Sequence, residues 1–452
     1  MKIDQLLEIL RERRAHLSVD KGGCLRVEAP KGALNSELQG ALRKQKKAII
    51  ALLESSASSQ TDYKLDAVLP DGFKVRQTLL FQKPELVLLT GATGFLGKYL
   101  LAELLQQTSL EVICLVRPTG QDRVEKELKK SGIWEDSFRS RLSYIEGDLA
   151  EELIGLDSKI YNELVQKVDL IFHNGAHVHH GLPYSSLRAA NVGGTLALLK
   201  LAAAAEASFH FVSSLSVLPS MSSGVTDRFF EADPLEEISP PRGGYNLTKW
   251  VAERLVENAG KLGLEIVIYR PGPISGHSVT GEFNRQDFLY RLVRGYIATG
   301  SAPAGKIPLD LLPVDYAARA MVWLTIRSSL RRDSLRRYHF LHPKPASSEL
   351  LFEACERAGL GIQRIPYQEW FQTLTKVASA GQKDHPLYPL VGLFASRGKS
   401  AQDHSEKAME VPYDCVETQK ILSTAAFPLP SLDGALFDRY LEAIIKEERM
   451  KT

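Results

Sequence analysis

One segment constrains the fold of this chain more than any other: an apolar stretch at residues 86–90 leads directly into a glycine-rich turn and then into a helical pattern. The turn spaces its three glycines as G-x-x-G-x-x-G. Glycine permits the tight turn and lets backbone N–H groups approach a pyrophosphate at the positive end of the helix. We therefore predict a dinucleotide site formed by Thr90, Gly91, Thr93, Gly94, Phe95, Leu96 and Gly97. A tight turn without a ligand is the alternative.

Beyond this segment, apolar strands alternate with helical stretches, which is the pattern of a parallel sheet covered on both faces. Strands are expected at residues 86–90, 111–116, 142–146, 170–173, 209–213 and 265–270, and helices at 95–107, 187–205 and 245–259. After residue 276 helical stretches dominate, at 288–297, 316–329, 350–358 and 436–446. The predicted fold class is α/β, with a doubly wound parallel sheet of the Rossmann type at 70–276 and a smaller, mostly helical substrate-binding lobe at 277–452.

The first 54 residues have a separate pattern. A short amphipathic helix at residues 6–10 precedes a hairpin signal, in which the turn 20–23 separates strands at 16–19 and 24–28, and a second helix follows residue 35. We expect a small α+β head at 1–54, joined by a flexible linker at 55–69 that begins with a Ser-rich stretch. Eleven Lys and Arg against seven Asp and Glu give this head a charge of about +4. That charge favours an acidic docking partner, although a solvated helix face explains it equally well.

The composition of the whole chain excludes several classes of protein. Fifty-six Lys and Arg against fifty-four Asp and Glu leave a net charge of +2, which gives no field to attract nucleic acid or an anionic membrane. No uncharged apolar run reaches the ~18 residues of a membrane span. Acidic residues interrupt the N-terminus, where a signal peptide needs an apolar core. The four cysteines are far apart, which is typical of a reduced, cytoplasmic protein without a disulfide framework.

Two arginines indicate which dinucleotide is bound. The second strand ends at Arg117, and Arg123 follows in the next helical stretch, whereas no Asp or Glu lies between residues 114 and 120. An acidic residue at this place holds the ribose 2′-OH of NAD, and an arginine accommodates the 2′-phosphate of NADP. We therefore expect NADPH as the cofactor, with a surface arginine at the rim of the sheet as the alternative.

A hydroxyl and an amine at helical spacing indicate proton chemistry. Tyr245 and Lys249 are four positions apart and so lie on one helix face. A nearby ammonium favours the phenolate, and we expect it to lower the pKa of the tyrosine towards a useful range. Ser214 follows the fifth expected strand, at the sheet edge that faces the ligand crevice. There its hydroxyl can donate to a developing oxyanion, so these three residues are the predicted catalytic set.

The order of these motifs resembles the extended short-chain dehydrogenase/reductase superfamily, and more specifically the thioester reductase domain of nonribosomal peptide and polyketide synthases. The matching motifs are LLTGATGFLG (88–97), CLVR (114–117), GDL (147–149), HNGAHV (173–178), FVSSLSV (211–217), GYNLTKW (244–250), YRPGPISG (269–276) and LPVDY (312–316). Ser214 stands where the family has a threonine, and Thr248 where it has a serine, so both hydroxyls are kept. The head is similar to the TubC-like N-terminal docking domain, most clearly at LRVEAPKGAL (25–34).

This resemblance implies further contacts with the cofactor. Asp148 would contact the adenine, and Asn174, Gly175 and Ala176 would lie along the dinucleotide, as would Asn191. Pro271 and Ile274 would border the nicotinamide, and Tyr245 and Lys249 would also hold the cofactor. Taken by themselves, these residues are also ordinary strand-end caps and turn formers.

Four histidines cluster between residues 173 and 180, namely His173, His177, His179 and His180. No carboxylate or cysteine nearby offers the further ligand that a metal usually needs. We therefore expect no metal and favour a histidine-lined loop near the substrate entrance.

Together these features predict an NADPH-dependent thioester reductase that releases an acyl or peptidyl chain as an aldehyde, with an alcohol as the product of a second reduction. No carrier domain is visible in the sequence, so the substrate is expected on the phosphopantetheine of a separate synthase subunit, with residues 395–410 as a flap near the carrier entrance. Two alternatives stay open: an oxidoreductase or epimerase acting on a free small molecule, and an NADP(H) sensor without catalysis. The first predicts full activity after residues 1–60 are deleted.

Overall fold

The computed structural model of this chain describes residues 16–19, 25–28, 36–47, 49–50, 63–75, 84–179, 182–219, 228–328, 335–379, 385–390 and 413–449. The chain divides into two compact units. The larger unit comprises residues 66–290, 306–361 and 405–452, and the smaller unit comprises 1–65, 291–305 and 362–404.

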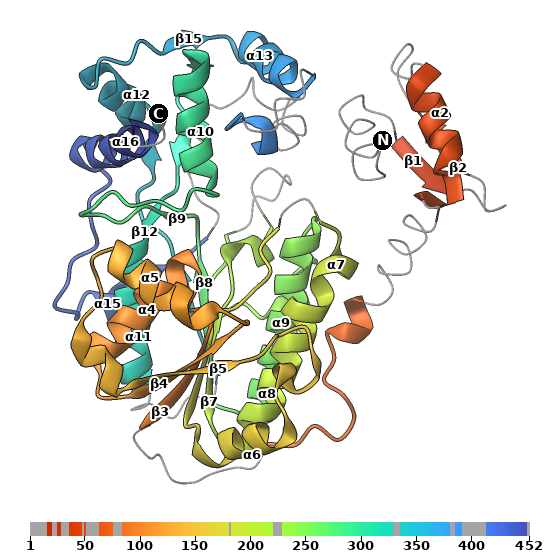
Figure 1. Cartoon of the computed structure of the whole chain (residues 1–452), viewed down its shortest axis with the longest axis vertical. Coiled ribbons are helices and arrows are strands. Elements are labelled where there is room, and N and C mark those ends of the chain that lie inside the picture. The colour runs from red at the N-terminus through yellow and green to blue at the C-terminus, as the bar shows by residue number, and fades with distance from the viewer. Residues whose placement is uncertain are drawn as a thin grey trace. The chain divides into compact units, whose positions relative to one another are not determined.

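The larger unit is built on a parallel sheet of seven strands (Figure 1), in the order β13-β8-β7-β6-β3-β4-β5. The strands are β3 (Leu86–Thr90), β4 (Glu111–Val116), β5 (Leu142–Glu146), β6 (Leu170–His173), β7 (Ser208–Val212), β8 (Ile266–Pro271) and β13 (Leu335–Phe340). The chain runs outward from β3 through β4 to β5, and then returns to build the other half from β6 to β13. The order therefore reverses between β3 and β6, and in such sheets the ligand crevice lies at the carboxyl ends of the strands beside that reversal. This arrangement confirms the predicted fold class.

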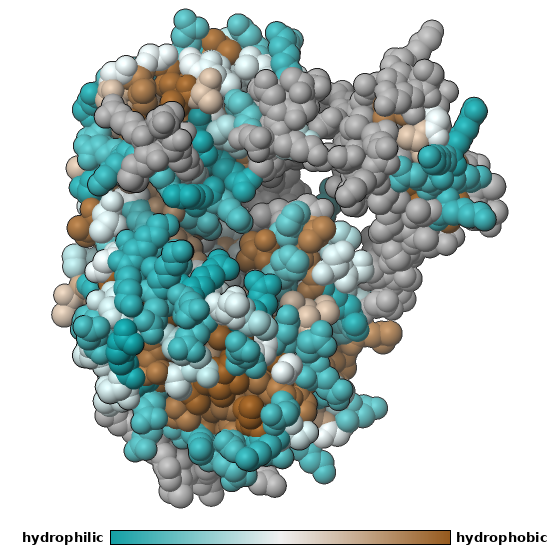
Figure 2. Space-filling model, viewed as in Figure 1, coloured by the Kyte–Doolittle hydropathy of each residue, from teal (hydrophilic) through white to brown (hydrophobic). Residues whose placement is uncertain are grey.

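Helices cover both faces of this sheet. The helices of the larger unit are α4 (Phe95–Gln107), α5 (Gly120–Lys130), α6 (Ser158–Lys167), α7 (Tyr184–Arg188), α8 (Gly194–Ala205), α9 (Gly244–Lys261), α11 (Val314–Ser328), α12 (Ser348–Arg357), α15 (Val416–Leu422) and α16 (Gly434–Arg449). In Figure 1, α4, α5 and α11 lie on one side of the sheet, and α6, α8 and α9 lie on the other. Figure 2 shows hydrophilic side chains over α4 and α5 and a hydrophobic group lower in the view, towards the edge strand β5. Helices that pack an apolar face on the sheet and expose a polar face to solvent are what an α/β core requires.

The sheet extends further along the chain than its sequence indicated. Both β13 and α11 follow residue 276, yet β13 pairs with β8 and α11 packs on α4. The larger unit thus contains elements that the sequence assigned to a separate lobe. The expected helix at 187–205 is also interrupted, because a π-helical turn, η3 (Ala189–Gly193), separates α7 from α8. Single π turns of this kind often occur at functional sites.

Short strand pairs and 3₁₀ turns complete the larger unit. β9 (Ile274–Ser275) pairs with β12 (Leu312–Pro313), and β11 (Pro308–Leu309) pairs with β14 (Ala346–Ser347). The 3₁₀ turns are η1 (Asp136–Ser140), η2 (Glu152–Gly155), η4 (Leu215–Val217) and η6 (Leu235–Glu237). The pairing of β9 with β12 fixes the backbone just beyond Pro271, which the family resemblance would place beside the nicotinamide.

The smaller unit contains β10 (Ser301–Pro303), β15 (Gln363–Ile365), α13 (Tyr367–Ser379), η7 (Tyr388–Leu390) and most of α10 (Phe288–Thr299). β10 pairs in parallel with β15. Trp370 of α13 is fully buried and meets the ring of Tyr296 at 5.9 Å between centroids. These contacts form an apolar cluster within the smaller unit.

The N-terminal head has the predicted hairpin. β1 (His16–Val19) pairs antiparallel with β2 (Leu25–Glu28), and α2 (Ser36–Lys44) follows with Leu38 and Leu42 buried. The predicted helix at 6–10, the Ser-rich stretch at 55–62 and the predicted flap at 395–410 lie outside the described residues. The end of the expected linker is fastened to the larger unit, because Asp66 accepts hydrogen bonds from Arg188 Nε at 2.6 Å and Tyr184 Oη at 2.7 Å.

Candidate functional site

The glycine-rich loop joins β3 to α4 at the reversal point of the sheet. Gly91 has a φ of +78°, and a Cβ there would lie 2.8 Å from the Cα of Gly175, so only glycine fits. Helix α4 begins after Gly94 without a side-chain cap and without an acidic residue in its first turn. Its first N–H groups therefore have no side-chain acceptor, which suits an anion at the positive end of the helix. The residues of this loop fit the pyrophosphate of a dinucleotide.

A chain of buried hydrogen bonds holds the two central strands together at this point. Thr90 Oγ1 accepts from the Gly175 N–H at 2.8 Å and contacts His173 Nδ1 at 2.8 Å. On the other side of the ring, His173 Nε2 contacts Thr195 Oγ1 at 3.0 Å, and that hydroxyl donates to the Asn191 carbonyl at 2.7 Å. These bonds assign the ring proton to Nε2. Burial, aided by the charge of Lys249, holds the pKa of His173 well below its usual value, so the ring is neutral.

Asparagine side chains fix the neighbouring loops. Asn174 Nδ2 donates to the Gly91 carbonyl at 3.3 Å and so supports the glycine turn. Asn191, in the π-helical turn, accepts from the His177 N–H at 2.7 Å and donates to the His177 carbonyl and to Thr248 Oγ1. Both N–H groups of Asn191 are thus engaged within the protein. It holds the loop after β6 against α9, which is a role that its sequence position alone did not indicate.

The two arginines predicted at the ribose lie at the carboxyl end of β4. Arg117 is the first residue after the strand, and Arg123 is in the first turn of α5. Both side chains are exposed, and neither guanidinium pairs with a carboxylate of the described residues. Asp148, after β5, accepts from the Ala150 N–H at 2.9 Å and so closes the turn there. Two available cations beside the crevice fit a phosphate group on the ribose.

The predicted catalytic residues lie on α9 and at the end of β7. Lys249 Nζ donates to the Val212 carbonyl at 2.7 Å and lies 3.9 Å from the centroid of the Phe211 ring. This contact ties α9 to the strand end that carries Ser214. Ser214 Oγ accepts from the Ser216 N–H at 3.1 Å and from Ser216 Oγ at 2.9 Å. Its hydroxyl proton is therefore available for another acceptor.

The electrostatics of the pair on α9 differ from the expectation. Burial raises the pKa of Tyr245 to about 12, whereas the sequence suggested that Lys249 would lower it. Burial also lowers the pKa of Lys249 to about 7, against the opposing effect of the Glu253 carboxylate. Burial penalises the charged phenolate, and this desolvation is the cause of the raised pKa of Tyr245. Tyr245 is consequently a neutral phenol at physiological pH and is ready to donate its proton.

The histidines of the loop after β6 do not converge. His173 is buried in the hydrogen-bond chain described above, His177 and His179 are exposed, and His180 lies outside the described residues. Within the described part of the chain, no group of three or more His, Cys, Asp or Glu side chains could hold a metal ion. None of the described helices combines the length and the apolar composition that crossing a membrane requires.

Pro271 ends β8, and the segment that follows it is held from two sides. Gly272 N–H donates to the Phe340 carbonyl at 2.8 Å, and the Leu312 N–H donates to the Pro273 carbonyl at 2.9 Å. Ile274 continues into β9. The predicted nicotinamide neighbours thus lie on a backbone fixed by β12 and by the end of β13.

This geometry can be compared with known proteins. Residues 89–321 match the profile of an NAD-binding family described as male sterility protein. The chain belongs to this family. It is an NAD(P)H-dependent reductase of the extended short-chain dehydrogenase/reductase type, as predicted. Residues 3–55 match the TubC N-terminal docking domain, which confirms the resemblance of the head.

The reductase is similar to solved structures over most of its length. The terminal R domain of the myxalamid PKS-NRPS biosynthetic pathway is 34% identical, with a TM-score of 0.75 over 86% of this chain and 97% of that one. Among curated relatives, a linear gramicidin synthase of Brevibacillus parabrevis is 33% identical over 80% of this chain but only 7% of its own length. L-2-aminoadipate reductase of Schizosaccharomyces pombe is 33% identical over 75% of this chain and 25% of its own length. The chain thus spans a quarter or less of the length of these two curated relatives.

The structure also reveals two polar residues of the reductase that the sequence did not single out. Glu253 lies one turn after Lys249 and is fully buried. Asp310 lies beside Gly272, where a Cβ on that glycine would come within 3.3 Å of the carboxylate. The i, i+4 spacing from Lys249 could have indicated Glu253. No local signal marks Asp310, which precedes β12 and meets Gly272 only through the fold.

Proposed function

We propose that this reductase uses NADPH to release an acyl or peptidyl chain, held as a thioester on a carrier protein, in the form of an aldehyde. The observation that carries this proposal is the hydrogen bond from Lys249 to the Val212 carbonyl, which joins α9 to the end of β7. It supports a site in which the Tyr245 phenol, the Ser214 hydroxyl and the Lys249 ammonium lie at the sheet edge of the glycine turn. A second reduction would give the alcohol.

Residues of this chain would contact each part of the cofactor. The glycine turn and the start of α4 would hold the pyrophosphate, and Arg117 and Arg123 would hold the 2′-phosphate of NADPH. Asp148 would contact the adenine, and Asn174, Gly175, Ala176 and Asn191 would line the dinucleotide. Pro271 and Ile274 would border the nicotinamide. When bound, NADPH supplies hydride for the carbonyl carbon of the thioester.

The catalytic side chains act on the substrate oxygen. Ser214 and the neutral phenol of Tyr245 donate hydrogen bonds to the carbonyl oxygen, and Tyr245 delivers its proton as the oxygen becomes an alkoxide. Lys249 stabilises the resulting phenolate and holds the cofactor ribose. The hemithioacetal then collapses: its hydroxyl proton returns to Tyr245, the carbon–sulfur bond breaks, and the phosphopantetheine thiolate leaves and is protonated.

The substrate would arrive on a separate polypeptide. The head supplies a means of attachment, since tethering converts a weak encounter into a local one with an effective concentration of roughly millimolar order. Its charge of about +4 favours an acidic docking segment on the synthase subunit that bears the phosphopantetheinylated carrier.

Incubation of the full chain with NADPH and an acyl-loaded carrier protein tests this function. We expect loss of acyl mass from the carrier, oxidation of NADPH, and formation of the corresponding aldehyde. Oxidation of NADPH by a free ketone or nucleotide sugar, with the loaded carrier unchanged, would favour a small-molecule oxidoreductase or epimerase. Binding of NADPH without oxidation by either class of substrate would favour a sensor.

A further inference from the structure

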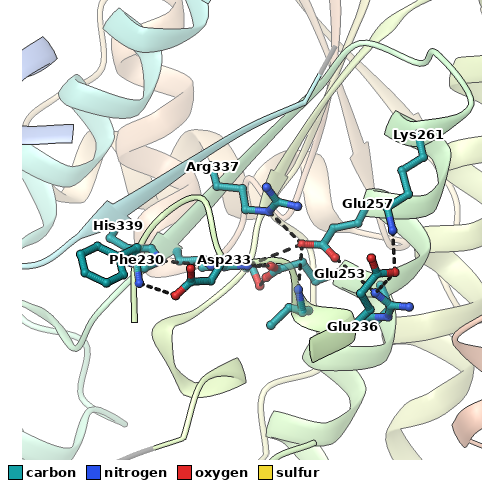
Figure 3. A network of polar contacts seen from close by, with 12 residues as sticks. Phe230, Asp233, Glu236, Glu253, Glu257, Lys261, Arg337 and His339 are labelled. Atoms are coloured by element: carbon teal, nitrogen blue, oxygen red, sulfur yellow. Dashed lines mark hydrogen bonds and ion pairs between the residues drawn. The ribbon is translucent and has the colours of Figure 1, made fainter. Parts of the chain in front are cut away.

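Glu253 is a buried carboxylate to which the proposed chemistry assigns no role. It projects from α9 one turn beyond Lys249, and its side chain is 0% exposed. Figure 3 shows Glu253 and Glu257 together with Arg337 and His339 in one polar network. An ionised carboxylate is costly to bury unless it is paired and hydrogen-bonded, so the partners of Glu253 indicate what it holds.

Those partners tie two strand ends to α9. Ser213 Oγ, next to the predicted catalytic Ser214, donates to Glu253 Oε2. On the other side, Arg270 of β8 donates through Nε to Glu253 Oε1 at 2.8 Å, and its Nη2 lies 2.6 Å from the same oxygen. One carboxylate thus connects the end of β7, the end of β8 and the helix that carries Lys249.

The guanidinium of Arg270 is itself fixed from behind. Its Nη1 donates to His339 Nε2 at 3.0 Å, and His339 Nδ1 donates to the Asp414 carbonyl at 2.6 Å. Burial and the nearby Arg270 lower the pKa of His339 to about 3, so the imidazole is neutral and accepts at Nε2. The positive charge of Arg270 therefore stays opposite Glu253 and cannot swing away.

The charged and titratable groups around Lys249 come from several elements. On α9 they are Tyr245 and Glu253, from β6 the neutral His173, and from β8 the cation of Arg270, which is paired with Glu253. The Val212 carbonyl and the Phe211 ring complete the surroundings from β7. Glu253 is the group in this set that supplies negative charge.

We propose that Glu253 is a positioning residue of the reductase site, which fixes the strand end of Ser214 through Ser213 and supplies the counter-charge for the Lys249 ammonium. The inference rests on the proposed reductase function. It assigns two separable effects to one side chain, one geometric and one electrostatic.

The sign of the electrostatic effect follows from the i, i+4 spacing of Lys249 and Glu253 on α9, which places the carboxylate near the amine. Lys249, with its pKa near 7, loses its proton as the pH rises through that value, and the ionised Glu253 opposes this loss. Replacing Glu253 by glutamine removes the negative charge and leaves Arg270 without its closest partner. Both changes disfavour the ammonium, so the alkaline limb of the pH–rate profile moves to lower pH.

The test compares Glu253→Gln with Glu257→Gln across pH 6–9. Glu257 is the control, because it is also fully buried on α9 but has other main partners, Arg337 Nε at 2.8 Å and Arg254 at 3.5 Å. It lies 3.7 Å from Arg270 Nη2, against 2.6 Å for Glu253. With NADPH and a loaded carrier, we expect Glu253→Gln to lower kcat and to move the alkaline limb downward by about one pH unit. Glu257→Gln should lower the thermal stability of the protein but leave the alkaline limb at its wild-type pH. An unmoved limb in Glu253→Gln, or equal movement in both variants, overturns the electrostatic role.

Two further measurements keep the inference testable if Glu253→Gln does not fold or if no thioester is reduced. Ser213→Ala removes the hydroxyl and leaves both charges, so it should lower kcat without moving the limb; an unchanged kcat overturns the geometric role. The reaction of the Lys249 amine with an acylating reagent, followed against pH by mass spectrometry, reports its proton without any substrate. Glu253→Asp keeps the charge and should leave the pH midpoint of this reaction near the wild-type value, whereas Glu253→Gln should lower the midpoint. A lowered midpoint in Glu253→Asp also overturns the counter-charge role of Glu253.

Discussion

Gly97 lies so close to Gly91 that a Cβ on Gly97 would come within 1.9 Å of the Gly91 carbonyl oxygen. That oxygen belongs to the backbone of the turn and cannot move aside as a side chain could. The third glycine of the motif is therefore required for the close packing of α4 on the end of β3, while the cofactor approaches elsewhere.

The first prediction separates these two requirements of the turn. Gly97→Ala should destabilise the protein by about 1–3 kcal/mol and abolish NADPH binding, because the turn must open to admit the methyl group. Gly94→Ala should destabilise the protein much less, since its Cβ would meet the Gly91 oxygen at 3.2 Å, which requires a shift of a few tenths of an ångström, and its φ of −84° suits alanine. The added methyl group should nevertheless weaken the binding of NADPH, because it lies where the backbone would approach the pyrophosphate. Thermal unfolding and fluorescence titration check both variants; a Gly97→Ala protein as stable as the wild type would contradict the packing argument.

The second prediction concerns the choice between NADPH and NADH. Arg117→Ala should weaken NADPH by roughly 10- to 100-fold, because a hydrogen bond to a charged group contributes about 1.5–3 kcal/mol. NADH, without the 2′-phosphate, should bind almost as before. Arg139→Ala is the matched control, since Arg139 is also exposed but pairs with Glu125 at 3.4 Å. Equal losses of both cofactors in isothermal titration would remove Arg117 from the phosphate site.

The strands of the doubly wound sheet were predictable because each is an apolar stretch bounded by turn residues. The structure has β3, β4, β5 and β6 at the predicted residues. Strand β13 was missed because its sequence, LRRYHF, carries three polar residues. Two of them, Arg336 and His339, are buried by contacts with residues far along the chain, among them Glu265 and Arg270. Strand preference here depends on tertiary partners that no local pattern contains.

The site was predictable in its residue types but not in its electrostatics. The spacing of Tyr245 and Lys249 placed them on one face of a helix, which α9 confirms. Spacing alone does not contain burial, and burial reverses the expected direction of the pKa of Tyr245. The partner of Glu253 was hidden for a similar reason, since Arg270 lies on another element and meets it only in the folded sheet.

The third prediction tests the phenol as proton donor. Tyr245→Phe should reduce turnover by about 10²–10⁴-fold, the usual contribution of a general acid, with NADPH affinity little changed. With its pKa raised to about 12 by burial, Tyr245 stays protonated across pH 6–9, so the wild-type profile should show no limb from this residue. Tyr161→Phe, which changes a tyrosine of α6 with no assigned role in the site, is the control and should keep full turnover. Near-normal steady-state rates for Tyr245→Phe would refute the assignment.

The fourth prediction concerns Asp310, whose Oδ1 is buried without a hydrogen-bond partner. Burial raises the pKa of Asp310 from 3.8 to about 6, against a backbone hydrogen bond from His342 that lowers it. A carboxyl whose pKa is higher in the folded protein stabilises the fold fully only at low pH, and that stability is lost as the pH rises through about 6. At 1.36 kcal/mol per unit, the loss approaches about 3 kcal/mol at pH 8.

Asp310→Asn removes this ionisation while keeping an oxygen to accept the His342 hydrogen bond. The variant should therefore be more stable than the wild type at pH 8 and should lose most of that advantage at pH 4, when urea unfolding is followed at both pH values. A stability difference of the same size at both would mean that Asp310 does not titrate in the folded protein. Because Asp310 adjoins Gly272, a more stable but less active variant would indicate that the reductase keeps this buried carboxyl for its site and not for its fold.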